Sequence, residues 1–470
     1  MKQLIKRLAQ FSLGTILATL LSGIQIPILT YFLLPEDYGQ AGLFRNLIIQ
    51  VPPFLYLGID HAFSREYRNK DNRTYLLSNS IILPLILSMM LSVLLYFYSE
   101  ELSIWLFNSP QYDYIVKIST VWLILIIFER FILLSFRMED MAKQYSFYTL
   151  LIKVVTFIIT MIMVYLGIRN FTVIVIGLLF GNIVPDVVLI IKYRKYLRFS
   201  FNDFDPTLVK QMLIFGFPQM IALTLTSFTN TTGNLFINNY TTTFELGIYN
   251  LGITIISLIG VLRTAFTTFW LPTAYKWKSE KKTLKHYEFI NKVVVFGCSV
   301  VFYLMILFLP LIRMVIGEDY EVVIYIIPIL SLQHIFFLTA ETTSLGIVFN
   351  RKTYLSVVVA ILMFIISIGL NLTLTPIIGY KGASLTISVT AFAYYVIITY
   401  FSRKTGFYIK QKRQVVAMLL MFIASLLIML EYNDIFWLIL LLAIITIFTL
   451  SDTYTTILNI KKNPEDWDFT

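Results

Sequence analysis

Long hydrophobic runs alternate with short polar segments along almost all of this 470-residue chain. An apolar run of about 20 residues can cross the roughly 30 Å hydrocarbon core of a bilayer as an α-helix, because each helical residue adds about 1.5 Å. The pattern therefore predicts an all-α polytopic membrane protein with about fourteen transmembrane helices. The predicted helices cover residues 8–34, 39–60, 77–98, 113–135, 146–168, 171–191, 211–236, 244–270, 289–315, 322–349, 355–376, 382–402, 414–430 and 435–458.

One stretch of the chain repeats an earlier one. Residues 244–277 open with an acidic residue and a glycine, continue as a long apolar run and end in a basic loop. Residues 35–70 align with this stretch without gaps at an offset of 208 residues. The matching charge layout predicts two related halves, as many transporters have. The aligned pairs are Asp37 and Glu245, Gly39 and Gly247, Leu43 and Leu251, Tyr67 and Tyr275, and Lys70 and Lys278.

The halves predict the domain organisation. The polar loop at residues 192–210 separates the sixth helix from the seventh and is the natural boundary. We expect two pseudo-symmetric six-helix bundles, an N-terminal lobe at residues 1–200 and a C-terminal lobe at 201–402. Residues 403–470 add two extra transmembrane helices and a cytoplasmic tail. Pro27 and Pro218 interrupt corresponding helices of the two halves, a pattern typical of cavity-lining helices in transporters.

Composition and charge support this class. The chain is 58% hydrophobic and only 14% charged, whereas soluble domains carry about 25% charged residues. The net charge is +10, but the basic residues follow the loops rather than forming a nucleic-acid-binding face. The segments on one side of the predicted helices carry 29 Lys and Arg, and those on the other side carry two. The positive-inside rule therefore predicts that both termini are cytoplasmic.

Several motifs carry a family resemblance. A basic start precedes the first helix, and LTYFLLPEDYGQAGLF follows at residues 29–44. The second half carries FGFPQMIALTLTSFTN, NLFINNYTTTFELGIYNLG and FWLPTAYKW. In order and spacing, over nearly the whole chain, these motifs resemble the Wzx-type O-antigen and capsular polysaccharide repeat-unit flippases of the MATE-like (MOP) superfamily. The matching positions are Phe215, Gly216 and Pro218 in helix seven, Gly247 and Tyr249 in helix eight, and Pro272 after it.

The resemblance implies a function and its partners. It implies translocation of an undecaprenyl-pyrophosphate-linked oligosaccharide across the bacterial inner membrane by alternating access, with no catalytic residue and no cofactor. It also implies contact with membrane lipids and with a polysaccharide polymerase and chain-length machinery. Coupling to H⁺ or Na⁺ is left open. Many relatives carry an Asp-Arg pair late in helix seven, where this chain has Gly233 and Asn234.

Charged residues inside the predicted spans are the candidate site. A charge in the bilayer core costs about 2.5–3.5 kcal/mol on insertion scales, which makes a functional role the default hypothesis. The alternative is that these charges pair between helices or snorkel to the interface. We expect Asp60 and Asp186 to be interface residues at inner helix ends. The candidate substrate-binding cations are Arg263, Lys153, Arg45 and Arg130, and the candidate coupling groups or charge partners are Glu341 and Glu129.

Two other functions stay open at this stage. A cation-coupled multidrug exporter of the same superfamily would favour carboxylates in its cavity, whereas cations outnumber carboxylates in these spans. A membrane glycosyltransferase or polymerase would need a sizeable outer loop with catalytic groups. The longest predicted outer loop, residues 99–112, offers only Glu100 and Glu101. His61, His286 and His334 do not cluster, so the sequence predicts no metal site.

Overall fold

The computed structural model describes residues 2–67, 72–139, 141–350, 352, 354–431 and 435–462. Lys70 of the predicted repeat lies outside these ranges. The chain forms two compact units, Met1–Thr231 and Thr232–Thr470, and helix α9 begins in the first unit and ends in the second. The three-part division predicted from the sequence, with its first boundary at residue 200, stays a prediction.

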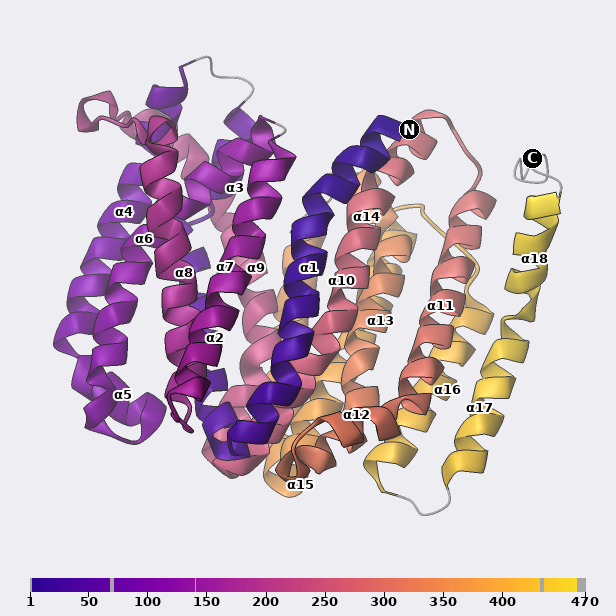
Figure 1. Ribbon diagram of the computed structural model, residues 1–470. Helices are drawn as coiled ribbons and strands as arrows, with labels where there is room; N and C mark the ends of the chain where they lie inside the picture. The colour runs from indigo at the N-terminus through magenta and orange to yellow at the C-terminus, as the bar shows by residue number, and fades with distance from the viewer. Residues whose placement is uncertain are drawn as a thin grey trace. The chain divides into compact units, whose positions relative to one another are not determined.

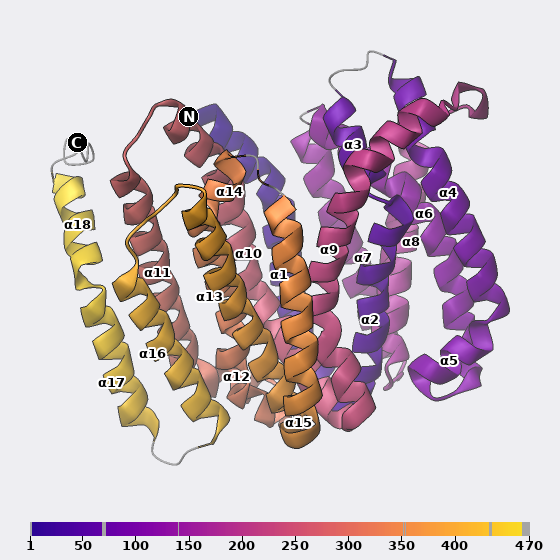
Figure 2. The same cartoon turned by 180° about the vertical axis from the view of Figure 1, so that it is seen from behind.

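The first unit is a bundle of long helices (Figure 1). The end of α3 and the loop after α8 lie at one end, and α5 lies at the other end (Figures 1 and 2). Its elements are α1 (Lys2–Phe32), α2 (Pro35–Tyr56), α3 (Ile59–Glu66), α4 (Arg73–Phe97), α5 (Ser99–Phe107), η1 (Pro110–Tyr112), α6 (Asp113–Met138), α7 (Ala142–Tyr165), α8 (Thr172–Lys192), η2 (Arg194–Leu197), η3 (Phe201–Asp203) and α9 (Pro206–Tyr240).

The second unit also consists of helices joined by loops, and no strand occurs among its described residues. The helices α17 and α18 follow one another along one edge of this unit, beside α11 and α16 (Figure 2). Its elements are α10 (Thr243–Ser279), α11 (Leu284–Leu307), α12 (Leu309–Val315), η4 (Glu318–Tyr325), α13 (Ile327–Thr343), α14 (Leu345–Phe349), α15 (Tyr354–Lys404), α16 (Lys412–Met429), α17 (Ile435–Thr449) and α18 (Ser451–Lys462).

These helices confirm the polytopic all-α class. Over the described residues, nine helices are long and apolar enough to cross a membrane, and three bent helix pairs can each supply one more span. The break at Ile378 and Gly379 divides α15 into two helices, as the separate predictions for 355–376 and 382–402 require. The remaining predicted span falls in α1, whose described apolar segment Ile16–Phe32 is shorter than these spans. Each of the fourteen predicted spans therefore coincides with a helix.

Two boundaries differ from the prediction. Residues 99–107, predicted as an outer loop, form helix α5, whose first turn holds Glu100 and Glu101 where acidic side chains favour the helix dipole. Phe107, at the end of α5, is buried and stacks on Phe171 with ring centroids 4.7 Å apart. Helix α10 continues through residue 272 to Ser279, so the predicted closing proline lies within the helix rather than after it.

A pair of equivalent hydrogen bonds supports the predicted repeat. In the first unit, Oδ1 of Asp37 accepts a hydrogen bond from the backbone N–H of Phe171, at the start of α8, at 2.9 Å. In the second unit, Oε2 of Glu245 accepts one from the backbone N–H of Tyr380, where the second half of α15 starts, also at 2.9 Å. In each half an acidic side chain at the start of the second helix therefore holds the N-terminus of the sixth.

Candidate functional site: the charged groups inside the spans

A sharp break between α2 and α3 carries Asp60 into the protein interior. Leu57 and Gly58 adopt left-handed conformations, with φ of 50° and 75°, and the two helices meet at a bend of 57°. Asp60 follows directly in the first turn of α3 and is only 3% exposed. Asp60 is therefore buried within the protein, and its expected place at the membrane interface stays a prediction. The predicted helix ends at the right place, but its last turn is bent inward.

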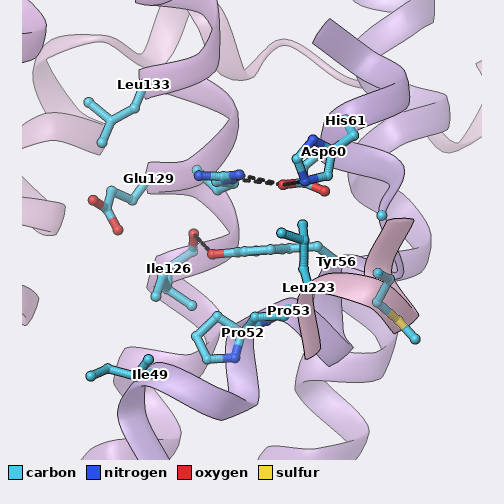
Figure 3. Close-up of a pocket in the computed structure, with 13 residues that line it drawn as sticks. Ile49, Pro52, Pro53, Tyr56, Asp60, His61, Ile126, Glu129, Leu133 and Leu223 are labelled. Carbon is cyan, nitrogen blue, oxygen red and sulfur yellow. Dashed lines mark hydrogen bonds and ion pairs between the residues drawn. The ribbon is translucent and has the colours of Figure 1, made fainter. Parts of the chain in front are cut away.

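Arg130 on α6 is the partner of Asp60. Its Nε donates to Oδ2 of Asp60 at 3.0 Å, and its Nη2 donates to the same oxygen. The hydroxyl of Tyr56 donates to the backbone carbonyl of Ile126 at 3.5 Å, and its ring lies beside the Arg130 guanidinium (Figure 3). Glu129 points away from Asp60 in the same view. This is expected because Glu129 and Arg130 are consecutive on α6, and consecutive helix residues face different neighbours.

This ion pair lies in the wall of a cavity. The cavity has a volume of about 330 Å³, and its polar side is formed by Tyr56, Asp60, His61, Glu129 and Arg130. The remaining lining is largely apolar and comes from α2, α6 and α9, including the two prolines of α2 (Figure 3). The first unit thus contains a partly polar cavity with both signs of charge.

A further buried acid lies near this cavity. Asp186 on α8 is only 1% exposed, and neither of its carboxylate oxygens has a hydrogen-bond partner among the described residues. Glu129 is the charged group that acts on it electrostatically. Asp186 is therefore also buried within the protein, and its expected place at the membrane interface stays a prediction. Its position inside an apolar helix, next to Pro185, was the only signal in the sequence.

Two of the predicted cations act on one another. Lys153 on α7 is exposed, and Arg45 on α2 is half-buried. Arg45 is the charged group that acts electrostatically on the Lys153 ammonium. No ion pair of Lys153 with an acidic side chain occurs in the part of the chain that the structure describes. This region of the first unit is therefore positive and is not neutralised at Lys153.

The second unit pairs its predicted cation with its predicted acid. Nη2 of Arg263 on α10 lies 3.4 Å from Oε1 of Glu341 on α13. The guanidinium also lies over the ring of Phe337, 4.5 Å from its centroid, and Trp270 donates from its indole N–H to the Glu341 backbone carbonyl at 3.2 Å. Arg263 therefore borders an apolar cavity of about 250 Å³ as a paired charge, together with His334 on α13.

The remaining intramembrane cations lie near helix ends and are paired. Lys117 forms an ion pair with Asp113 one turn earlier on α6. Arg313 on α12 donates from its Nε to Glu321 at 2.9 Å. Among the described residues, no group of three or more His, Cys, Asp or Glu side chains could hold a metal ion.

The bundle of apolar helices, crossed by charged side chains, defines a multi-pass membrane protein. Its fold resembles that of "Lipid II flippase MurJ, inward closed conformation", with a TM-score of 0.69 and 17% identity over 95% of this chain and 99% of the other. It also resembles the inward-facing and outward-facing conformations of a multidrug resistance MATE family transporter of the MOP superfamily. The TM-scores are 0.62 and 0.58, the identities 16% and 18%, and the coverage 84% and 85% of this chain and 94% and 95% of the other.

The sequence itself assigns the family. The chain belongs to the polysaccharide biosynthesis protein family, whose model matches residues 28–325. A search of curated proteins found no match. The family thus rests on the sequence match, and the likeness to the solved flippase and transporters is a likeness of fold.

Proposed function

We propose that this protein is a flippase that moves an undecaprenyl-pyrophosphate-linked oligosaccharide repeat unit from the inner to the outer leaflet of a bacterial inner membrane by alternating access. The observation that carries the proposal is the polysaccharide biosynthesis family match on a fold shared with a lipid II flippase over 95% of the chain. The glycan would belong to an O-antigen or a capsule, and a polymerase with its chain-length machinery would receive it. No step requires a catalytic residue.

The cations of the first unit support an anionic substrate. Lys153 and Arg45 act on one another as like charges, and Lys153 has no acid paired with it among the described residues. Two like charges in a medium of low polarity repel strongly, so an anion that contacts both is favoured. A pyrophosphate carries the required charge, and a guanidinium can bind it through two parallel hydrogen bonds. We assign Arg45 and Lys153 as its principal contacts.

In this proposal Arg263 and Arg130 are not the principal contacts of the pyrophosphate. Each already has an acid within ion-pair distance, Glu341 and Asp60 respectively, so each presents less net charge to a substrate. A pyrophosphate could bind Arg263 or Arg130 only by competing with that acid. We therefore propose that these pairs rearrange during transport, with Glu341 released when substrate binds Arg263.

The proposed orientation follows from the basic loops. In the first unit the end of α3 and the loop after α8 lie at the same end, opposite α5 with its Glu100 and Glu101 (Figure 1). The positive-inside rule assigns the basic end to the cytoplasm, so both termini would be cytoplasmic. A fluorescent reporter that matures only in the cytoplasm, fused after Thr470, should fluoresce. Activity of a periplasmic reporter at that position would refute this orientation.

The main test joins genetics to glycan analysis. Deletion of the gene should cause a lipid-linked glycan to accumulate on the cytoplasmic side of the membrane. When the deletion strain is complemented with Arg45→Ala or Lys153→Ala, glycan export should fall although the membrane abundance of the protein stays normal. When it is complemented with the double variant, the lipid-linked glycan should accumulate as it does after deletion. Lys117→Ala is the matched control, because it removes an intramembrane cation that already has a partner on its own helix. Full export by the double variant would remove both residues from the site.

One observation favours a second function, a cation-coupled multidrug exporter. Asp186 and Glu129 are carboxylates inside the spans of the first unit, and Asp186 has no hydrogen-bond partner among the described residues. An exporter would use such acids to bind a cationic drug or a coupling ion. Resistance to cationic dyes that is lost in Asp186→Asn, with unchanged glycan export, would favour the exporter. Loss of glycan export in the same variant would instead make Asp186 a coupling residue of the flippase.

A further inference from the structure

A second polar cavity lies in the first unit, away from the charges described above. Its lining comes from α3, the start of α4, the end of α6 and the 3-10 turn η2. Its volume is about 320 Å³, near the lower end of the roughly 300–1,000 Å³ typical of ligand pockets. Three cations, Arg73, Lys195 and Arg198, and one acid, Glu139, line it, together with the aromatic rings of Phe63, Tyr67 and Tyr196.

The loop that carries two of these cations is held firmly against α4. Oγ of Ser78 accepts a hydrogen bond from the backbone N–H of Ser200 at 2.9 Å. Asn79 makes two hydrogen bonds to the same loop: its Nδ2 donates to the carbonyl of Asp203 at 2.9 Å, and its Oδ1 accepts from the N–H of Asp205 at 2.6 Å. Ser78 and Asn79 are fully buried, so these bonds fix the loop to the bundle.

Aromatic packing fixes the other end of the loop. Tyr193 packs edge-on against Phe136 of α6 with ring centroids 4.7 Å apart, and Tyr196 does the same at 5.7 Å. Phe136 itself is fully buried. The segment that holds Lys195 therefore has a rigid base, and its ammonium lies 5.1 Å from the ring centroid of Tyr196.

Two tyrosine hydroxyls donate hydrogen bonds to the carboxylate of Glu139, the acid that lines the cavity. Tyr67 donates to Oε1 of Glu139 at 2.7 Å, and Tyr196 donates to Oε2 at 2.6 Å. Burial and the hydrogen bond to Glu139 raise the pKa of Tyr67 to about 12, and the same causes raise the pKa of Tyr196. Both phenols therefore stay protonated and remain donors at neutral pH. Glu139 is therefore held by these two hydroxyl donors.

We infer that this cavity binds a phosphate group at the membrane surface. Lys195 and Arg198 line it on one rigid loop, and Arg198 offers the planar donors that suit phosphate oxygens. Arg73 is also positioned by stacking on the Tyr67 ring, 4.1 Å from its centroid. The cavity lies where α4 begins and α6 and α8 end, the level at which lipid headgroups meet a membrane protein. A lipid headgroup is therefore the occupant we assign, with a free phosphate as the other source of the same chemistry.

This inference is independent of the proposed flipping reaction, because it concerns binding at one end of the first unit only. The test uses the full-length protein in phosphatidylcholine nanodiscs. Binding of dihexanoyl phosphatidylglycerol and of inorganic pyrophosphate is measured separately. Lys195→Gln and Arg198→Gln should each weaken binding about tenfold, the effect of one charge-assisted hydrogen bond.

The loop supplies its own controls. Lys192 and Arg194 are exposed cations of the same segment that do not line the cavity, so Lys192→Gln and Arg194→Gln should leave the affinity nearly unchanged. Glu139→Gln removes the single negative charge and should tighten binding. Binding of the lipid supports a headgroup site, and binding of pyrophosphate alone supports a soluble phosphate. Binding of neither, or equal weakening by cavity and control variants, would overturn the inference.

Discussion

Gly58 and Gly216 pack backbone against backbone within the first unit. A Cβ atom at Gly58 would lie 2.1 Å from the Gly216 carbonyl oxygen, and one at Gly216 would lie 2.2 Å from the Gly58 carbonyl oxygen. Gly216 is the glycine of the FGFP motif, so this motif packs against the bend that carries Asp60 inward. The contact explains why a small residue is required at both positions.

We predict that alanine at either glycine destabilises the protein. Overpacking of this kind costs about 1–3 kcal/mol. Gly58→Ala should cost more, because its φ of 75° is also unfavourable for a residue with a side chain. The measurement is the melting temperature of the purified protein. Gly297→Ala and Gly369→Ala are the controls, since no atom lies within 4 Å of their added methyl groups. Equal melting temperatures for all four variants would contradict the packing argument.

The ion pair between Arg263 and Glu341 predicts a coupled pair of mutations. Arg263→Ala leaves Glu341 without its cation, and an unsatisfied charged group costs about 1–3 kcal/mol or more, so membrane abundance should fall. If the pair is purely structural, adding Glu341→Ala should restore both abundance and glycan export. If Arg263 also binds substrate, the double variant should recover abundance while export stays low. Abundance and export must therefore be measured on the same membranes.

The equivalent acids of the two halves predict parallel effects. Asp37→Ala and Glu245→Ala each remove the acceptor for a helix N-terminus, and loss of such a cap typically costs about 1 kcal/mol. Asp37→Asn keeps an acceptor oxygen and should be milder. Glu36→Ala, one residue earlier, is the charge control. Melting temperatures of the purified variants test this, and a large effect in one half with none in the other would contradict a shared structural role.

Most of the fold could be predicted because the length of an apolar run alone determines whether a helix crosses a bilayer. The repeat could be predicted for a similar reason: Asp37 and Glu245 keep the same place in each half and make equivalent bonds. Among the charges, Glu341 could be named as a partner for one of the cations because few acids lie inside the spans. Each of these signals is local in sequence or depends on composition.

The bend before Asp60 could not be predicted in this way. Leucine disfavours positive φ, yet Leu57 adopts a φ of 50°, because the packing of Gly58 on a distant glycine dictates the local backbone. The phosphate-binding cavity was missed for a related reason. In the sequence, Lys195 and Arg198 look like ordinary basic loop residues. Only the structure shows that buried side chains of α4 fix the loop that carries them.

The last prediction concerns acid stability and the loop before α9. Oδ2 of Asp205 accepts a hydrogen bond from the Tyr75 hydroxyl, and Oδ1 accepts from the backbone N–H of Thr207 at 2.8 Å. The Tyr75 hydrogen bond, with that of Thr207, lowers the pKa of Asp205 below its ordinary 3.8. A lowered carboxyl pKa contributes stability that is present above the ordinary value and lost as the pH falls through the lowered one.

The melting-temperature gap between wild type and Asp205→Asn should therefore be constant near neutral pH and shrink below about pH 3.8. Asp203→Asn removes the same charge from the same loop and should show no such gap. A gap for Asp205→Asn that is independent of pH down to about pH 3 would show that the ionised carboxylate is not what stabilises the loop.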